Sequence, residues 1–188
     1  MHRSLLLAAG ALALAFTGPA LSQDTTPTSP TEPELSDRND LPAGSEVTVS
    51  TPQEFATMAA HSNMFEIESS RIALDKAQSD EVRQFAQRMV DDHTMAAEEM
   101  KAAAEADGVN DVPQTLDAAH QQQITELENA SADQFDSQYV QMQVAAHQQA
   151  VALFSSYAEQ EGALADFAEK TLPTLQEHLD RIQEIAQQ

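Results

Sequence analysis

Helix start and stop signals dominate the chain from residue 51 onwards. Thr51-Pro52-Gln53-Glu54 is a capping box with proline at the first helical position. Ser79-Asp80-Glu81 combines a helix cap with two acids in the first turn, where they meet the positive end of the helix dipole. Gly108 and Gly162 indicate helix ends. With the apolar spacing, these signals predict helices over about 52–77, 80–107, 114–129, 132–161 and 163–187.

Four of these helices are long and their connections are short, so sequence neighbours are expected to run antiparallel. Apolar residues recur at helical spacing over 82–103 and again over 135–157, which predicts a buried stripe on each helix. Only five glycines and 5% aromatic residues argue against an all-β sandwich. The predicted fold is all-α, an up-and-down four-helix bundle with an additional short helix. Pro173 is expected to bend or split the last helix.

The segments before the first helix predict export. Residues 1–22 combine a basic start, an apolar run and small residues at the expected cleavage point, as a signal peptide does. A retained N-terminal anchor is the alternative. Residues 23–50 are acidic and rich in Pro, Thr and Ser, and they are predicted to form a disordered tether. We therefore expect a periplasmic, secreted or envelope-associated protein whose folded domain spans residues 51–188.

Charge and cysteine content narrow the classes of partner and chemistry. The chain has 9 Lys+Arg against 31 Asp+Glu and a formal net charge of -22, which repels nucleic acid and anionic membranes. No later apolar run is long enough to anchor the chain in a bilayer. The sequence has no cysteine, which excludes disulfides, zinc fingers, iron–sulfur clusters and thiol nucleophiles.

Three histidines interrupt apolar stripes on three different predicted helices. His93, His147 and His178 each share a helical line with apolar residues, so they are expected to converge inside the bundle. Glu66 lies in a groove of small residues on the first helix and supplies a carboxylate. Imidazole and carboxylate together suit Zn²⁺, Fe²⁺, Mn²⁺ or Cu²⁺, and bundle interiors commonly hold such sites. The prediction is one transition-metal ion bound by these four residues.

The same cluster has a structural interpretation. Glu66 could pair with one or two of the imidazoles inside the bundle, and Tyr139 could help to satisfy their hydrogen-bonding groups. His61 is a reserve ligand on the first helix. At helical spacing it can lie beside Glu68, which is an alternative carboxylate. His120 is interpreted as a packing residue of the short helix.

Methionine offers a further interpretation. Met89 precedes His93 by one helical turn, and the chain contains seven methionines. Thioether sulfur selects Cu(I), which makes copper a candidate. Methionine at helical spacing more often fills a core, so this pattern does not by itself identify the metal.

Longer motifs resemble a known family. The motifs are Met64-Phe65-Glu66-Ile67-Glu68, Met89-Val90-Asp91-Asp92-His93-Thr94 and Thr171-Leu172-Pro173 leading into His178-Leu179. Residues 55–186 resemble DUF4142, a family of exported bacterial ferritin-like helical bundles of unknown function. The resemblance implies that fold and export. It adds Asp92 and Tyr139 as secondary candidate ligands, and its recurring polar positions fall on Glu66, Asp92, His93, Tyr139, His147 and His178.

One departure from redox ferritins bears on chemistry. Ferritin-like diiron sites use a Glu-x-x-His pair on each of two helices. Here the residues three positions before His93, His147 and His178 are Val90, Val144 and Leu175. The sequence therefore favours a mononuclear site over a diiron site, and the fold alone does not imply ferroxidase or oxygen chemistry.

Two classes of function follow. The first is an exported metal-binding or stress-associated protein that uses the His/Glu cluster. The second is a non-catalytic structural or interaction module with an unidentified envelope partner, in which the cluster only stabilises the bundle. The sequence shows no nucleophile–base arrangement, so catalysis would be limited to a metal-activated water.

Overall fold

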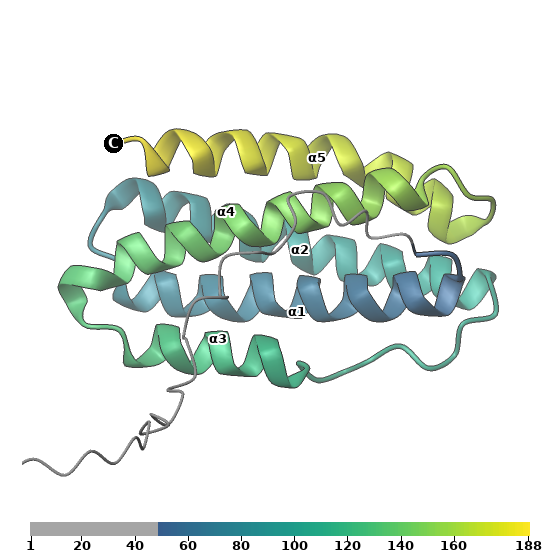
Figure 1. Ribbon diagram of the computed structural model, residues 1–188, viewed down its shortest axis with the longest axis horizontal. Helices are drawn as coiled ribbons and strands as arrows, with labels where there is room; N and C mark the ends of the chain where they lie inside the picture. The colour runs from purple at the N-terminus through teal and green to yellow at the C-terminus, as the bar shows by residue number, and fades with distance from the viewer. Residues whose placement is uncertain (1–48) are drawn as a thin grey trace, which may run out of the picture. The chain divides into compact units, whose positions relative to one another are not determined.

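The computed structural model describes residues 49–188, and residues 1–48 lie outside its description. The predicted signal peptide and nearly all of the tether therefore fall outside the described residues. All regular elements within 49–188 are helices: α1 Pro52–Lys76, α2 Asp80–Ala106, α3 Ala118–Asn129, α4 Ala132–Tyr157 and α5 Ala163–Ala186 (Figure 1). The all-α prediction is confirmed.

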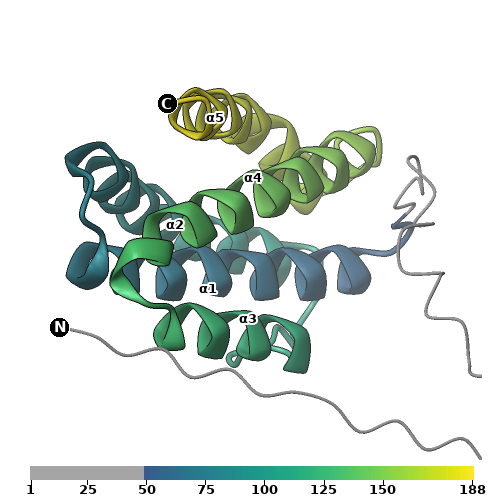
Figure 2. The same ribbon diagram turned by 60° about the vertical axis from the view of Figure 1, so that its left-hand side comes forward.

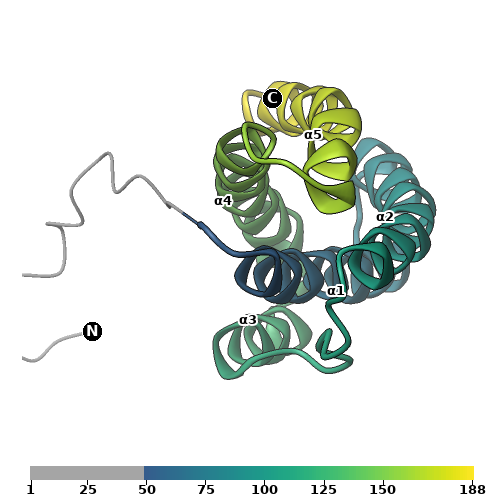
Figure 3. The ribbon, with the colours of Figure 1, turned by 90° about the vertical axis from the view of Figure 1, so that its right-hand side faces the viewer.

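Four helices enclose the core. Viewed along the bundle, α1, α2, α5 and α4 form a ring, and α3 lies outside it against α1 (Figure 3). Figure 2 shows the same order, with α3 beside α1 and α5 on the far side of the bundle. The predicted four-helix bundle with an additional short helix is therefore present. No helix in the described part of the chain is both long and apolar enough to cross a membrane.

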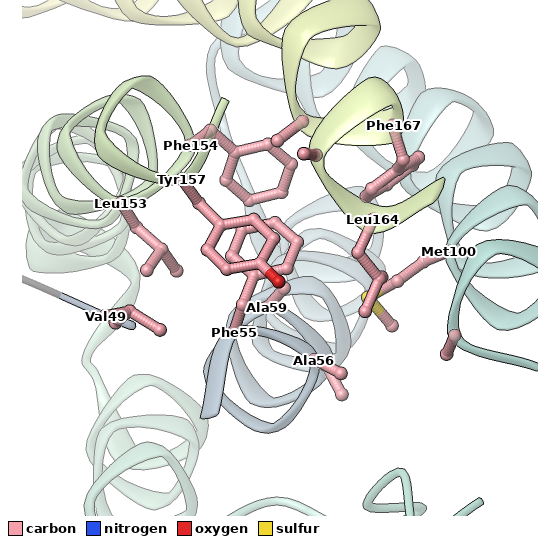
Figure 4. Packing of buried hydrophobic residues seen from close by; sticks show 14 of the residues in the cluster. Val49, Phe55, Ala56, Ala59, Met100, Leu153, Phe154, Tyr157, Leu164 and Phe167 are labelled. Atoms are coloured by element: carbon pink, nitrogen blue, oxygen red, sulfur yellow. The ribbon is translucent and has the colours of Figure 1, made fainter. Parts of the chain in front are cut away.

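The buried apolar residues form two clusters, one towards each end of the bundle. In the first cluster, Phe55 of α1 stacks on Tyr157 of α4 with ring centroids 4.1 Å apart (Figure 4). The second contains Phe85, Phe135 and Ile182. On each long helix, the residues of one cluster are separated along the chain from those of the other by buried polar residues. These polar residues are Glu66, Ser69, Ser70, His93, Gln143, His147 and His178.

Two predicted helix boundaries were wrong. The third helix begins at Ala118 rather than at 114, because the Asp117 side chain caps it by accepting a hydrogen bond from the His120 backbone N–H. The fourth helix ends at Tyr157 rather than 161. Gly162 is the N-cap of α5 and not the end of α4. Pro173 does not split α5, which is one helix from Ala163 to Ala186.

Side chains distant in sequence cap the helices. Asp107 at the end of α2 accepts hydrogen bonds from the backbone N–H groups of Ala163 and Leu164 at 2.9 and 2.8 Å. Asp136 of α4 does the same for the N–H groups of Gln78 and Ser79 before α2. Ser79 and Thr51 cap their own helices as predicted.

Ser131 precedes α4 but does not cap it with its side chain. The Ser131 hydroxyl does not accept a backbone N–H, and it instead donates to Gln134 Oε1 at 2.9 Å.

Replacement of Gly162 by alanine should destabilise the protein. Gly162 has φ 121° and ψ 173°, a region that essentially only glycine adopts. An added Cβ would also lie 2.8 Å from Asp107 Oδ2. We expect Gly162→Ala to lower the free energy of unfolding by about 3 kcal/mol, measured by urea denaturation.

The matched control is Gly108→Ala. Gly108 has φ 75° and has no atom within 4 Å of an added Cβ. Its replacement should cost only about 1 kcal/mol, the backbone penalty of a left-handed residue. Equal costs at the two glycines would contradict the strain expected from a Cβ at Gly162 beside Asp107.

Candidate metal centre

Three histidines from three helices meet in the polar layer. His93 of α2, His147 of α4 and His178 of α5 are 6%, 1% and 1% exposed. Their ring centroids are 5.5–5.9 Å apart in all three pairs. One nitrogen from each ring lies within 4.8 Å of the other two. Among the described residues, no other group of three or more His, Asp or Glu brings its donor atoms this close.

One nitrogen of each ring is fixed by a hydrogen-bond acceptor. The pairs are His93 Nδ1 to Asn63 Oδ1 at 3.0 Å, His147 Nδ1 to the Gln143 backbone oxygen at 2.9 Å, and His178 Nε2 to Asp92 Oδ2 at 2.8 Å. Because each partner is an acceptor, the nitrogen that faces it carries the proton. The other nitrogen of each neutral ring therefore carries a free lone pair.

These remaining nitrogens have no partner among the described residues. His93 Nε2, His147 Nε2 and His178 Nδ1 are all buried and make no hydrogen bond. Buried polar atoms are nearly always satisfied, so three unsatisfied acceptors in one place require an explanation. A cation would satisfy all three at once, because metal ions bind neutral imidazole through this lone pair. The donor set therefore fits a transition-metal ion.

Burial keeps the three imidazoles neutral. It lowers the pKa of His93 well below the usual value, and charge on His147 and His178 would lower it further. Burial lowers the pKa of His147 to about 4, although its hydrogen bond to the Gln143 carbonyl opposes the shift. The pKa of His178 is also lowered by burial, against the opposing effect of Asp92. All three lone pairs are therefore available at neutral pH.

Glu66 lies beside the cluster, next to the His147 nitrogen that is already hydrogen-bonded. Its Oε1 atom is 3.7 Å from His147 Nδ1, the nitrogen that already donates to the backbone, and its Oε2 atom is buried without a hydrogen bond. Burial raises the pKa of Glu66 to about 8, with partial opposition from Gln143. In this arrangement Glu66 is a neutral acid at pH 7, and it is not a member of the group that His93, His147 and His178 form.

The secondary candidate residues occupy different places. Asp92 contacts His178, and Arg88 Nε donates to the same Asp92 oxygen at 3.1 Å. The Tyr139 hydroxyl forms a 2.9 Å hydrogen bond with Ser70 Oγ. Glu68 is exposed on α1. The remaining candidate, His61, lies on a different side of α1, beside His120 of α3.

Sequence reasoning missed the acceptors that orient two of the rings. Asn63 is one of the small residues of the groove around Glu66, and its side-chain oxygen accepts a hydrogen bond from His93. Gln143 fixes His147 through its backbone oxygen and donates from its side chain to Ser69 Oγ at 3.1 Å. Its position one turn before His147, on the same buried line, was the available signal.

A small cavity adjoins the cluster at His93. Its volume is about 20 Å³, which is room for about one water-sized ligand. Its polar lining comes from Ser62, Asn63 and Thr171, and Met100 is among its apolar residues. The space beside His93 therefore has room for one water-sized molecule next to that ring.

Comparison with solved structures places this fold among known helical bundles. A DUF305 fragment from Deinococcus radiodurans superposes with a TM-score of 0.64 at 14% identity. CopM in the Cu(I)-bound form superposes with a TM-score of 0.62 at 19% identity. Each match covers 74% of this chain and 97% of the other. No curated protein matches the sequence.

The family model of DUF4142, a domain of unknown function, matches residues 38–185. The chain therefore belongs to this family, as its motifs indicated. The match extends slightly beyond the helical domain on its N-terminal side.

The stability of the metal-free protein should depend on pH in two opposite ways. The histidine pKa values are lowered on folding. The stability that the three neutral imidazoles contribute is therefore fully present above about pH 6.5 and is lost as the pH falls below it. The Glu66 pKa is raised, so its contribution is complete below pH 4.5 and is lost as the pH rises towards 8. Melting temperature should therefore be highest near pH 6–7.

Glu66→Gln separates the two effects. This variant should keep the loss of stability in acid and abolish the decline between pH 6.5 and 8, which amounts to about 1 kcal/mol per pH unit in the parent protein. The exposed Glu68→Gln on the same helix is the control and should retain both slopes. A parent protein with the same melting temperature from pH 5 to 8 would contradict neutral burial of these groups.

Proposed function

We propose that this DUF4142 protein binds one copper or zinc ion through His93 Nε2, His147 Nε2 and His178 Nδ1. The observation that carries the proposal is the convergence of three buried lone pairs that have no partner among the described residues. Each of the three rings is held by its other nitrogen, so the donors are oriented before an ion arrives. This support by outer hydrogen bonds is typical of histidine metal ligands.

The donor chemistry narrows the metal. Three imidazoles without an ionised carboxylate suit copper and zinc better than manganese, which prefers oxygen ligands. Copper(II) also binds nitrogen sites more tightly than other divalent ions of the first transition row. The similar fold of CopM, solved in its Cu(I)-bound form, supports copper as the first ion to test.

The proposed role is to hold the ion rather than to catalyse a reaction. Burial of the cluster and the absence of a nucleophile–base pair in the sequence favour binding over turnover. A bound ion would supply a Lewis acid beside the small cavity at His93, large enough for one water-sized ligand. We also propose that the protein acts outside the cytoplasm after removal of residues 1–22, where it could contribute to resistance to metal stress.

The alternative is a purely structural cluster. The network that joins Ser69 to Gln143 and Ser70 to Tyr139 runs through the same layer and helps to specify the packing of α1 against α4. In that case the protein would serve as an envelope module with a protein partner. No contact in the described residues favours a particular partner, and metal analysis separates the two functions.

Metal content of the untagged protein, purified from the periplasm without chelator, tests the proposal. We expect about one equivalent of copper or zinc by plasma mass spectrometry. A His93→Ala, His147→Ala double variant should retain less than a tenth of this, because two of three ligands are lost. Mass analysis of the same sample tests removal of residues 1–22.

The control is a Thr94→Ala, Gln148→Ala double variant, since these residues are the exposed neighbours of the two ligands. It should bind as much metal as the parent protein. The proposal fails if the purified parent contains no metal and its melting temperature does not rise when copper or zinc is added, because an ion that binds only the folded state must stabilise it.

Asp92 should matter through His178 rather than as a ligand. Its carboxylate accepts the Nε2 hydrogen of His178 and so directs Nδ1 towards the other two rings. Asp92→Ala should weaken metal affinity about 10–100-fold, as expected for loss of a ligand's supporting carboxylate. The neighbouring Asp91 is exposed, and Asp91→Ala should leave affinity unchanged in a competition titration. Equal affinity in both variants would contradict the supporting role.

A further inference from the structure

A second histidine pair lies on a different side of α1. A cavity of about 200 Å³ lies between α1, the N-terminus of α3 and α4. Polar and sulfur-bearing side chains line it together with alanine and leucine. The lining includes Met58, His61, Asp117, His120, Gln149 and Leu153. None of these residues belongs to the three-histidine cluster.

His120 resembles a supported metal ligand. Its Nδ1 lies 3.0 Å from Asp117 Oδ1, and because a carboxylate oxygen is an acceptor, Nδ1 carries the proton. When the ring is neutral, its Nε2 atom therefore holds a free lone pair. Asp117 also offers a negative charge at the N-terminus of α3, where the helix dipole alone would disfavour a cation.

His61 supplies the second donor. Its Nδ1 atom is buried and makes no hydrogen bond in the described part of the protein, although the residue as a whole is half-buried. The His61 and His120 rings are nearly parallel, with an interplanar angle of 19° and centroids 6.4 Å apart. An unpaired imidazole nitrogen beside a carboxylate-supported imidazole is hard to explain by packing alone.

The separation of the rings is compatible with a shared ion. An ion bound at about 2.0–2.1 Å from an imidazole nitrogen lies about 3.2 Å from the ring centroid. Two rings on opposite sides of one ion then have centroids about 6.4 Å apart, which is the separation observed here. A bent nitrogen–metal–nitrogen angle would require the two ring centroids to be closer together than this. Both side chains are half-buried, so they can make that movement. The Met58 thioether, 41% exposed, lines the same cavity.

We propose a second metal site, formed by His61 and His120 with Met58 as a thioether donor. Two imidazoles and a thioether suit copper, and the sulfur favours Cu(I). The site has fewer preorganised nitrogens than the buried cluster and is open to solvent, so it binds more weakly and exchanges its ion more readily. It does not depend on the three-histidine site, because the two sites share no ligand.

Titration of the metal-free, untagged protein with Cu(I) in competition with a chromogenic chelator tests this site. The parent protein should bind two equivalents, the second at least 10-fold more weakly than the first. His61→Ala and His120→Asn should each remove the weaker equivalent and leave the tighter one. The His93→Ala, His147→Ala variant should show the opposite result and keep only the weaker equivalent.

Met58→Leu tests the thioether donor, and Gln121→Ala is the matched control. Met58→Leu preserves apolar bulk and should weaken the second Cu(I) equivalent about 10-fold or more, with little effect on Zn²⁺. Gln121 is exposed beside His120, and Gln121→Ala should bind both equivalents like the parent. Far-UV circular dichroism confirms that each variant is folded.

The second site is refuted if a folded His61→Ala, His120→Asn double variant binds as much Cu(I) as the parent protein. That result would leave the three-histidine site unaffected. Conversely, if the buried site does not bind Cu(I), the parent protein will lack the tighter equivalent. The weaker equivalent will still be present in the parent and absent from His61→Ala.

Discussion

The organisation of this protein depends on the cost of burying polar atoms in the middle of a helical bundle. The apolar clusters at the two ends could in principle merge into one continuous core. Instead, each of the four long helices carries at least one buried polar residue between them. An unsatisfied buried acceptor costs about 1–3 kcal/mol. Three such nitrogens from three histidines therefore destabilise the folded protein unless a ligand binds them.

The surrounding structure holds this layer in place. Asp107 and Asp136 fix the starts of α5 and α2 through backbone N–H groups, which sets how the helices meet at the two ends. Antiparallel packing then brings the middle of every long helix to the same level. Asn63 and Asp92 each accept a hydrogen bond from one nitrogen of His93 and His178, which fixes the orientation of these two rings and leaves their other nitrogens free. The end contacts position the helices, and the acceptors orient the ligands.

Much of this fold could be predicted from the sequence, because the caps and apolar spacing of long helices are local signals. The convergence of His93, His147 and His178 followed from the same spacing. The nitrogen of each ring that remains free could not be predicted, because it depends on hydrogen-bond acceptors contributed by other residues. Asp92 is an example: the family resemblance gave it as a secondary candidate ligand, yet its carboxylate accepts a hydrogen bond from His178 Nε2. The role of Gly162 was missed because its partner Asp107 lies on another helix.

The most direct test of the central claim is the coordination of the bound ion. X-ray absorption at the copper or zinc edge, on the His61→Ala variant loaded with one equivalent, counts the imidazoles around the ion in the buried site alone. We expect three nitrogen donors at about 2.0 Å, each with the outer-shell scattering of an imidazole ring. An ion surrounded mainly by oxygen, or by a single imidazole, would contradict a three-histidine centre.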